Sequence, residues 1–316
     1  MKEIGGYIDI DVLIKKPYYD EGIELNSGRN ALLYIIEAQK ISKIYLPYFI
    51  CDSIINVLNV NSVSYEFYKI NSKFEPIFNS EIALNEKILI VNFYGLISNN
   101  TLLQYKEMYT RIIVDNTHAF FQAPLSGVDT FYSCRKFLGV PDGAYLFTNI
   151  LLSRKLDIDR SGNRFNHLLN RGETSAKEYF ADYLENEKSL YDLGLMFMSR
   201  ITSNILGAID YDLIIKNRKR NYNFLAKELN KYNRLNLDLF VGIPYVYPLL
   251  VENGEQIRKN LIENKIYVPL LWPNLIALGD DMIEKKLAIN ILPLPCDQRY
   301  DESDMKLIVK EILKNV

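Results

Sequence analysis

Short apolar runs alternate with helical patterns along the first 150 residues of this 316-residue chain. Runs that end in a polar residue, glycine or proline are typical of strands buried on both faces of a sheet. They lie at residues 41–48, 87–92, 111–115, 129–133 and 144–147. Helical spacing begins at Asp52, a residue type favoured as a helix N-cap. This alternation predicts an α/β fold with a mostly parallel sheet.

The rest of the chain has a different pattern. Charge-rich helical spacing dominates from about residue 160 to 235, with an amphipathic helix expected at 212–230. Beyond it, strand-like apolar runs alternate with helical segments. The strand-like runs are 246–251, 266–271 and 289–295, and the helical segments are 256–263 and 303–313. We therefore expect a large α/β domain over residues 1–235 and a small α+β domain over residues 236–316.

Composition narrows the possible partners. Hydrophobic residues make up 48% and charged residues 24% of the chain, as in ordinary globular proteins. A net charge of −2 gives no basic excess for nucleic acid. No stretch approaches the roughly 20 apolar residues that span a bilayer, and no apolar signal core is visible. The 3 scattered cysteines and 2 histidines show no metal-ligand spacing. We expect a cytoplasmic protein without a metal, nucleic-acid partner or membrane partner.

Polar residues stand where three of the predicted strands end. Asn92, Asp115 and Ser133 occupy these positions. Right-handed crossovers place the carboxyl ends of parallel strands at one edge of the sheet, where ligands bind. A carboxylate there is costly to desolvate without a partner. Asp115 is therefore either a loop or helix-capping acid, or the partner of a cationic cofactor nitrogen.

Lys136 follows the run at 129–133 and precedes a proline- and glycine-containing loop at 140–144. Most lysines are solvated surface residues. A lysine just beyond a strand end can instead act as a nucleophilic amine. Adjacent Arg135 would support this role by lowering the pKa of the Lys136 amine.

A polar turn, Ser27-Gly28-Arg29, opens an apolar helix near the start of the chain. The free N–H groups and positive dipole end of a helix suit a phosphate, although Ser27 is equally compatible with a plain helix cap. Pyridoxal 5′-phosphate (PLP) needs a phosphate site, a carboxylate for its ring nitrogen and a lysine for its aldehyde. The chain offers these groups in the order helix start, Asp115, Lys136, which indicates PLP as the cofactor.

These motifs resemble those of the DegT-type nucleotide-sugar aminotransferases, PLP enzymes of the aspartate aminotransferase fold (fold type I). Residues 27–32 (SGRNAL) resemble the family's phosphate-binding SGTAAL, and residues 114–119 (VDNTHA) resemble its EDCAHA. The strand at 130–133, Lys136 and the glycine loop at 142–144 follow the family's order. The LPLP at 292–295 is similar to its closing segment.

The resemblance implies a role for each matched residue. Lys136 would form the Schiff base and then move a proton between two carbon atoms. Asp115 would pair with the pyridine nitrogen, and His118 would lie near the ring's hydroxyl edge. The residues implied for the phosphate are Ser27, Gly28, Arg29 and Ser133.

The resemblance also implies a reaction. An amino group would pass from glutamate to a keto-sugar nucleotide, in polysaccharide or cell-envelope sugar biosynthesis. The partners would be these small molecules and a second copy of the chain, because family members are homodimers with active sites at the subunit interface.

The chain departs from the family pattern at several positions. Arg29 replaces a threonine, and Ser133 stands three residues before Lys136 rather than five. The ring-stacking aromatic is replaced by Cys51, with Tyr48 or Phe49 as possible substitutes. The stretch at 160–206 stands in place of the family's Asn-Tyr-Arg motif. Other PLP chemistry (lyase or dehydratase) and a non-catalytic homologue therefore stay open.

Overall fold

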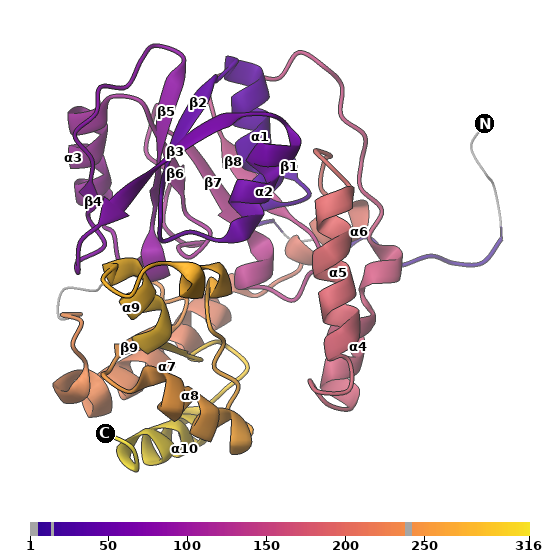
Figure 1. Ribbon diagram of the computed structural model, residues 1–316. Coiled ribbons are helices and arrows are strands. Elements are labelled where there is room, and N and C mark those ends of the chain that lie inside the picture. The colour runs from indigo at the N-terminus through magenta and orange to yellow at the C-terminus, as the bar shows by residue number, and fades with distance from the viewer. Residues whose placement is uncertain (1–5, 14–15, 238–241) are drawn as a thin grey trace.

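The computed structural model describes residues 6–13, 16–237 and 242–316. An eight-stranded sheet lies in the upper part of the molecule (Figure 1). Its strands, in spatial order, are β1 (Ile23–Leu25), β8 (Ala144–Phe147), β7 (Asp129–Ser133), β6 (Ile112–Asp115), β5 (Glu86–Val91), β2 (Lys43–Pro47), β3 (Ser64–Ile70) and β4 (Pro76–Ile77). Pairing is parallel from β7 through to β3 and antiparallel at both sides. The predicted α/β class with a mostly parallel sheet is confirmed.

The central strands form where the sequence is continuously apolar. The runs at 111–115 and 129–133 become β6 and β7, and every residue of these two strands is buried. The sequence reading missed β1, β3 and β4. β1 has 3 residues and β4 has 2, which are too few to show a period. β3 mixes exposed and buried positions, so it lacks the apolar run of a central strand.

Three helices pack on this sheet. α1 (Gly28–Gln39) contacts β7 and β8, α2 (Asp52–Val60) lies against α1, and α3 (Asn99–Tyr109) lies against β6. Ser27 is the N-cap of α1, because its hydroxyl accepts a hydrogen bond from the Asn30 N–H. The predicted N-cap of α2 is off by one residue. Cys51 holds that position without a capping hydrogen bond from its side chain, and Asp52 is the first helical residue.

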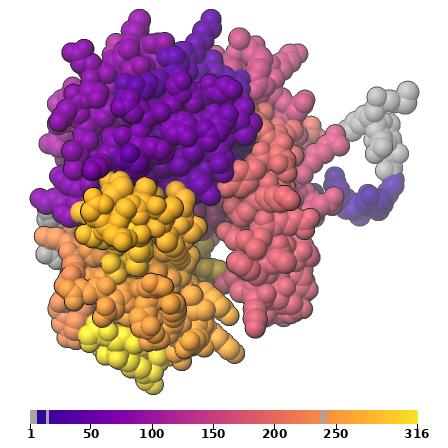
Figure 2. Space-filling view, viewed as in Figure 1, coloured from indigo at the N-terminus to yellow at the C-terminus, as the bar shows by residue number. Residues whose placement is uncertain are grey.

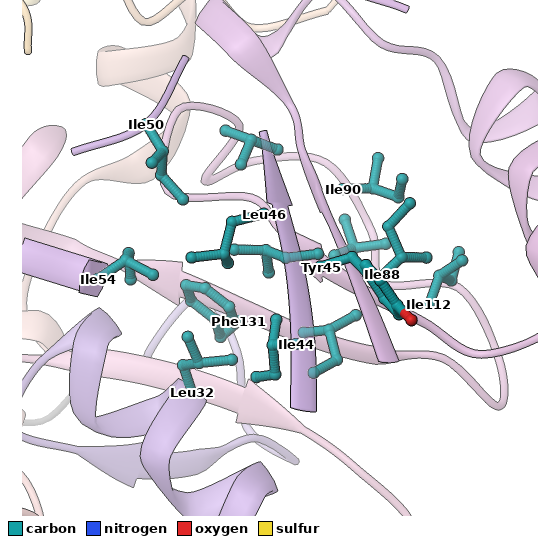
Figure 3. Close-up of a cluster of buried hydrophobic side chains, with 14 of the residues drawn as sticks. Leu32, Ile44, Tyr45, Leu46, Ile50, Ile54, Ile88, Ile90, Ile112 and Phe131 are labelled. Carbon is teal, nitrogen blue, oxygen red and sulfur yellow. The ribbon is translucent and has the colours of Figure 1, made fainter. Parts of the chain in front are cut away.

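The main core lies between the sheet and these helices. Figure 3 shows side chains from α1, α2 and four strands converging on one cluster. The labelled members are Leu32, Ile44, Tyr45, Leu46, Ile50, Ile54, Ile88, Ile90, Ile112 and Phe131. Burying an aliphatic or aromatic side chain of this size contributes about 1.5–3 kcal/mol. Burial of this cluster therefore stabilises the relative positions of β5, β6 and β7, whose ends form one edge of the sheet.

The charge-rich segment is helical, as predicted. It contains α4 (Asn166–Glu173), α5 (Phe180–Asp192), α6 (Arg200–Leu206) and α7 (Tyr211–Leu229). The first three helices stand beside the sheet (Figure 1). Asn186 attaches α5 to the loop after Lys136, because its side-chain amide donates to the Pro141 carbonyl at 3.0 Å.

The C-terminal elements lie below the sheet in Figure 1. They are the antiparallel pair β9 (Tyr247–Leu250) and β10 (Ile291–Leu294), with α8 (Gly254–Glu263), α9 (Ile283–Asn290) and α10 (Glu302–Leu313). The run at 266–271 forms no strand, and Pro269 within it cannot donate to a ladder. Side chains of α7 and of the C-terminal elements share one hydrophobic cluster. The domain boundary at 235 stays a prediction.

No helix in the described ranges is both long enough and apolar enough to cross a membrane.

Candidate active site

A cavity of about 340 Å³ lies at the edge of the sheet where the parallel strands end. This volume is at the lower end of the roughly 300–1,000 Å³ typical of small-molecule sites. Every predicted site residue lines it. These residues are Ser27, Gly28, Arg29, Asp115, His118, Ser133 and Lys136. Residues from α1, β6, β7 and the turn after β7, far apart in sequence, therefore meet in one place.

Asp115 is the last residue of β6 and is only 6% exposed. Its register partners are Val91 on β5 and Phe131 on β7, and all three line the cavity. The Thr117 N–H donates to Asp115 Oδ1 at 2.9 Å, which holds the side chain in place. Burial raises the pKa of Asp115 to about 6, against the opposing effects of the Thr117 hydrogen bonds and the Lys136 charge. The ionised carboxylate is therefore costly until a cation joins it.

Lys136 closes a 3₁₀ turn, Cys134–Lys136, directly after β7. The Cys134 N–H donates to the Gly143 carbonyl at 3.0 Å, which ties this turn to the glycine loop. The Lys136 side chain is exposed to the open space of the cavity, although protein atoms surround it. The pKa of Lys136 is raised, with the nearby Tyr245 phenol as the largest cause and Cys51 and Tyr183 adding to it, against the opposite effects of burial and of Arg135. Arg135 thus lowers this pKa as expected, but the net shift is upward.

The start of α1 forms a cationic end of the cavity. The Arg29 guanidinium carbon lies 3.8 Å from the centre of the Tyr191 ring. Arg29 Nη1 is buried and has no hydrogen-bond partner among the described residues. At Gly28, an added Cβ would approach Thr117 Cγ2 at 3.3 Å, so a side chain there would crowd the cavity wall. The helix N-terminus and an unsatisfied guanidinium N–H together suit an anion.

His118 is 4% exposed and stacks on Tyr245, with ring centres 4.3 Å apart, and on Trp272. Its Nδ1 accepts a hydrogen bond from the Tyr94 N–H at 3.4 Å. Burial, helped by the charge of Lys136, lowers the pKa of His118 well below its ordinary value. The imidazole is therefore neutral and carries its proton on Nε2.

The three candidates for ring stacking differ in whether they line the cavity. Cys51 lines the cavity, together with Ile50 and Ile54. Phe49 is fully buried in the core against Trp272, and Tyr48 stacks on Phe67. Neither Tyr48 nor Phe49 lines the cavity, so the predicted substitution by one of them receives no support.

Asn92, the third strand-end residue, does not line the cavity either. It is fully buried, and its amide donates to the side chains of Asn116 and Gln122. These bonds join the loops that follow β5 and β6, so Asn92 supports the site without facing it.

Several lining residues were missed by the sequence reading. Tyr183, Glu187 and Tyr191 lie one turn apart on α5 and line the cavity together, and Glu187 forms an ion pair with Arg135. Their spacing of four residues was a usable signal, since it places side chains on one helix face. Residues 269–272 complete the wall and end in Trp272, the chain's only tryptophan.

The chain matches no protein-family model and no curated protein. Solved structures do match. The sugar aminotransferase from Micromonospora echinospora is 14% identical with a TM-score of 0.63, over 93% of this chain and 87% of that one. The DegT DnrJ EryC1 StrS aminotransferase from Brucella abortus is 17% identical with a TM-score of 0.57, over 92% and 85%.

A third similar structure is the PLP form of a Streptococcus pneumoniae protein described as a sugar aminotransferase. It is 14% identical with a TM-score of 0.60, over 91% of this chain and 85% of that one. Identities this low establish the architecture alone. The chain therefore has the fold of the DegT/DnrJ/EryC1/StrS-type sugar aminotransferases, as its sequence motifs predicted.

Proposed function

We propose that this chain is a PLP-dependent aminotransferase whose cofactor binds in the cavity at the end of β6 and β7. The observation that carries the proposal is that Asp115, Lys136 and the N-terminus of α1 line a single cavity. The fold supports the proposal, because proteins described as aminotransferases share it and one was solved in its PLP form.

The lining residues fit the three polar ends of PLP. The α1 N-terminus, the unpartnered Arg29 Nη1 and the Ser133 hydroxyl suit the phosphate. Asp115 has a pKa of about 6 because it is buried, and a protonated ring nitrogen beside it would stabilise its ionised form. The Lys136 amine would be the nucleophile for the aldehyde once it has lost its proton.

When bound, the cofactor supplies an electron sink for the bond broken at the substrate carbon. The chain's own groups do the rest. Asp115 would keep a proton on the ring nitrogen, and Lys136 would carry the proton that moves at the substrate carbon. His118 offers a hydrogen bond from Nε2 without adding charge, since burial keeps it neutral.

The substrates belong to the same proposal. We take glutamate as the amino donor and a keto group on a nucleotide-linked sugar as the acceptor, in polysaccharide or cell-envelope sugar biosynthesis. The support is that structures with this fold are described as sugar aminotransferases. The homodimer stays a prediction from the resemblance.

Product analysis tests the proposal. The PLP-loaded protein is mixed with glutamate and a keto-sugar nucleotide, and we expect one 2-oxoglutarate for each aminated sugar. A lyase or dehydratase would consume the sugar without releasing 2-oxoglutarate. If glutamate yields no 2-oxoglutarate even in a single turnover without acceptor, the aminotransferase assignment with this donor is wrong.

A further inference from the structure

A second cavity, of about 330 Å³, adjoins the candidate active site. Arg135, Lys136 and Tyr183 line both cavities. The other walls of the second cavity come from α4, α5, α7 and residues 297–299. In Figure 2 the surface is hollowed where the α4–α5 segment meets the C-terminal elements. The two cavities therefore share a wall at Lys136, and the second lies directly beside the proposed reacting group.

Positive charge dominates this cavity. Among the described residues that line it, five are basic and one is acidic: Arg135, Lys136, Arg171, Arg218 and Arg299 against Asp297. His167 adds no charge near neutral pH, because burial and the charge of Arg135 lower its pKa. The balance favours an anionic ligand.

Three of the arginines are already engaged. The Arg218 guanidinium donates to Gln298 and to the Phe137, Pro244 and Tyr245 carbonyls. Arg299 forms a two-point ion pair with Asp297, and Arg135 pairs with Glu187. These contacts brace the walls of the cavity.

Arg171 is different. It lies on α4 and is exposed, and its guanidinium has no ion pair or hydrogen bond recorded within the described part of the chain. Aromatic side chains of α5 stand beside it. Phe180 and Tyr183 stack with ring centres 5.9 Å apart and are both more than 40% exposed. This wall of the cavity thus combines the Arg171 guanidinium with the exposed rings of Phe180 and Tyr183.

We propose that this second cavity binds an anionic group, a carboxylate or a phosphate, of a substrate that reacts at Lys136, and that Arg171 is its main ligand. The inference rests on the proposed function only for the statement that the substrate reacts at Lys136. Arg171 and the aromatic wall belong to the stretch at 160–206, which stands in place of one of the family's motifs. Substrate choice would therefore be set by residues of this divergent stretch.

Pyrophosphate is the probe for the cavity. Its dissociation constant is measured by calorimetry on the purified protein and on the Arg171→Gln, Arg29→Gln and Arg160→Gln variants. Arg171→Gln should weaken binding roughly ten- to hundredfold, as expected for one charge-assisted contact. Arg160→Gln is the matched control, since Arg160 is exposed and lines neither cavity, and it should leave binding unchanged.

The variants also separate the two cavities. An affinity that is unchanged in Arg171→Gln overturns the proposal. An affinity that is reduced only in Arg29→Gln also overturns it and places the oxyanion in the first cavity. This titration needs no turnover, so its outcome is independent of the proposed reaction. If the purified protein fails to bind PLP, the proposed function fails while the pyrophosphate comparison still decides the anion site.

The two sources of the anion are distinguished by donor kinetics in the PLP-loaded protein. If the group is the distal carboxylate of the donor, Arg171→Gln raises KM for glutamate but not for alanine, with kcat little changed. If it is a phosphate of the acceptor, glutamate kinetics stay unchanged while pyrophosphate binding falls. Either result supports the proposal. If Arg171→Gln changes neither glutamate kinetics nor pyrophosphate binding, the proposal is contradicted.

Discussion

Asp115 and Lys136 each have an electrostatic state that their neighbours explain. Asp115 is buried at the end of β6, so its pKa rises to about 6. Lys136 stays cationic, because Tyr245 and its other neighbours raise its pKa more than burial and Arg135 lower it. The ionised form of Asp115 is thus destabilised, and the Lys136 amine is protonated. Both states last until a bound ligand changes the environment of the two side chains. A pyridinium ring would relieve the strain on Asp115 directly.

Asp115→Asn should cripple turnover more than cofactor binding. The amide cannot hold the ring nitrogen protonated, whereas the proposed phosphate site at α1 is untouched. We expect kcat to fall at least roughly a hundredfold, with the PLP dissociation constant changed far less. Steady-state kinetics and a PLP titration measure the two effects. An unchanged kcat would show that Asp115 has a different role.

Asp115→Asn should also change how stability depends on pH. The folded-state pKa of about 6 lies above the ordinary aspartate value of 3.8. The free energy of unfolding therefore falls as pH rises between these two values, because the unfolded state loses the Asp115 proton first. The loss is complete above pH 6 and amounts to up to about 3 kcal/mol. The asparagine variant lacks this loss. Urea unfolding of both cofactor-free proteins from about pH 4 to about pH 8 should show the variant gaining relative stability as pH rises, and a pH-independent difference would refute the assignment.

At the scale of elements, the parts of the site carried by strand ends could be predicted and the parts carried by α5 could not. Asp115 and Ser133 follow apolar runs, and this local pattern is visible without a structure. The docking of α5 depends on contacts such as Asn186 with Pro141, which no local pattern encodes. Trp272 reaches the cavity from a segment that forms no strand, so its position depends entirely on tertiary packing.

Tyr191 is the contact through which α5 positions Arg29. A cation–π contact of this kind contributes about 0.5–2 kcal/mol, so Tyr191→Leu should weaken PLP binding roughly two- to thirtyfold. Tyr232→Leu is the control, because Tyr232 makes a similar contact with Lys231 and lines neither cavity. Equal PLP affinities in the two variants would mean that Tyr191 does not support the phosphate end.

At the scale of the whole molecule, the apolar lining of the candidate site belongs to the main cluster of packed side chains. The main cluster holds the sheet and its helices, and a second cluster joins α7 to the C-terminal elements. The fold class follows from hydrophobic periodicity and was predictable for that reason. The sequence did not predict how α4–α5 and residues 269–272 close over the sheet edge, because that arrangement depends on contacts between distant segments.

Gly254 tests the packing within the C-terminal part. It begins α8, and an added Cβ would lie 2.5 Å from the Asn290 Cα at the end of α9. Backbone cannot move aside cheaply, so Gly254→Ala should lower stability by about 1–3 kcal/mol. Gly172→Ala in α4 meets nothing within 4 Å and should instead stabilise slightly. Thermal melting compares them, and equal melting temperatures would contradict this packing.

The most direct test of the account is whether PLP becomes attached to Lys136. The purified protein is incubated with PLP, reduced with borohydride, digested and analysed by mass spectrometry, alongside Lys136→Ala. We expect visible absorbance before reduction and a single modified peptide bearing the adduct on Lys136, with neither signal in the variant. A protein that stays colourless, or an adduct on another lysine while Lys136 is unmodified, would contradict the assignment of this cavity as a PLP site.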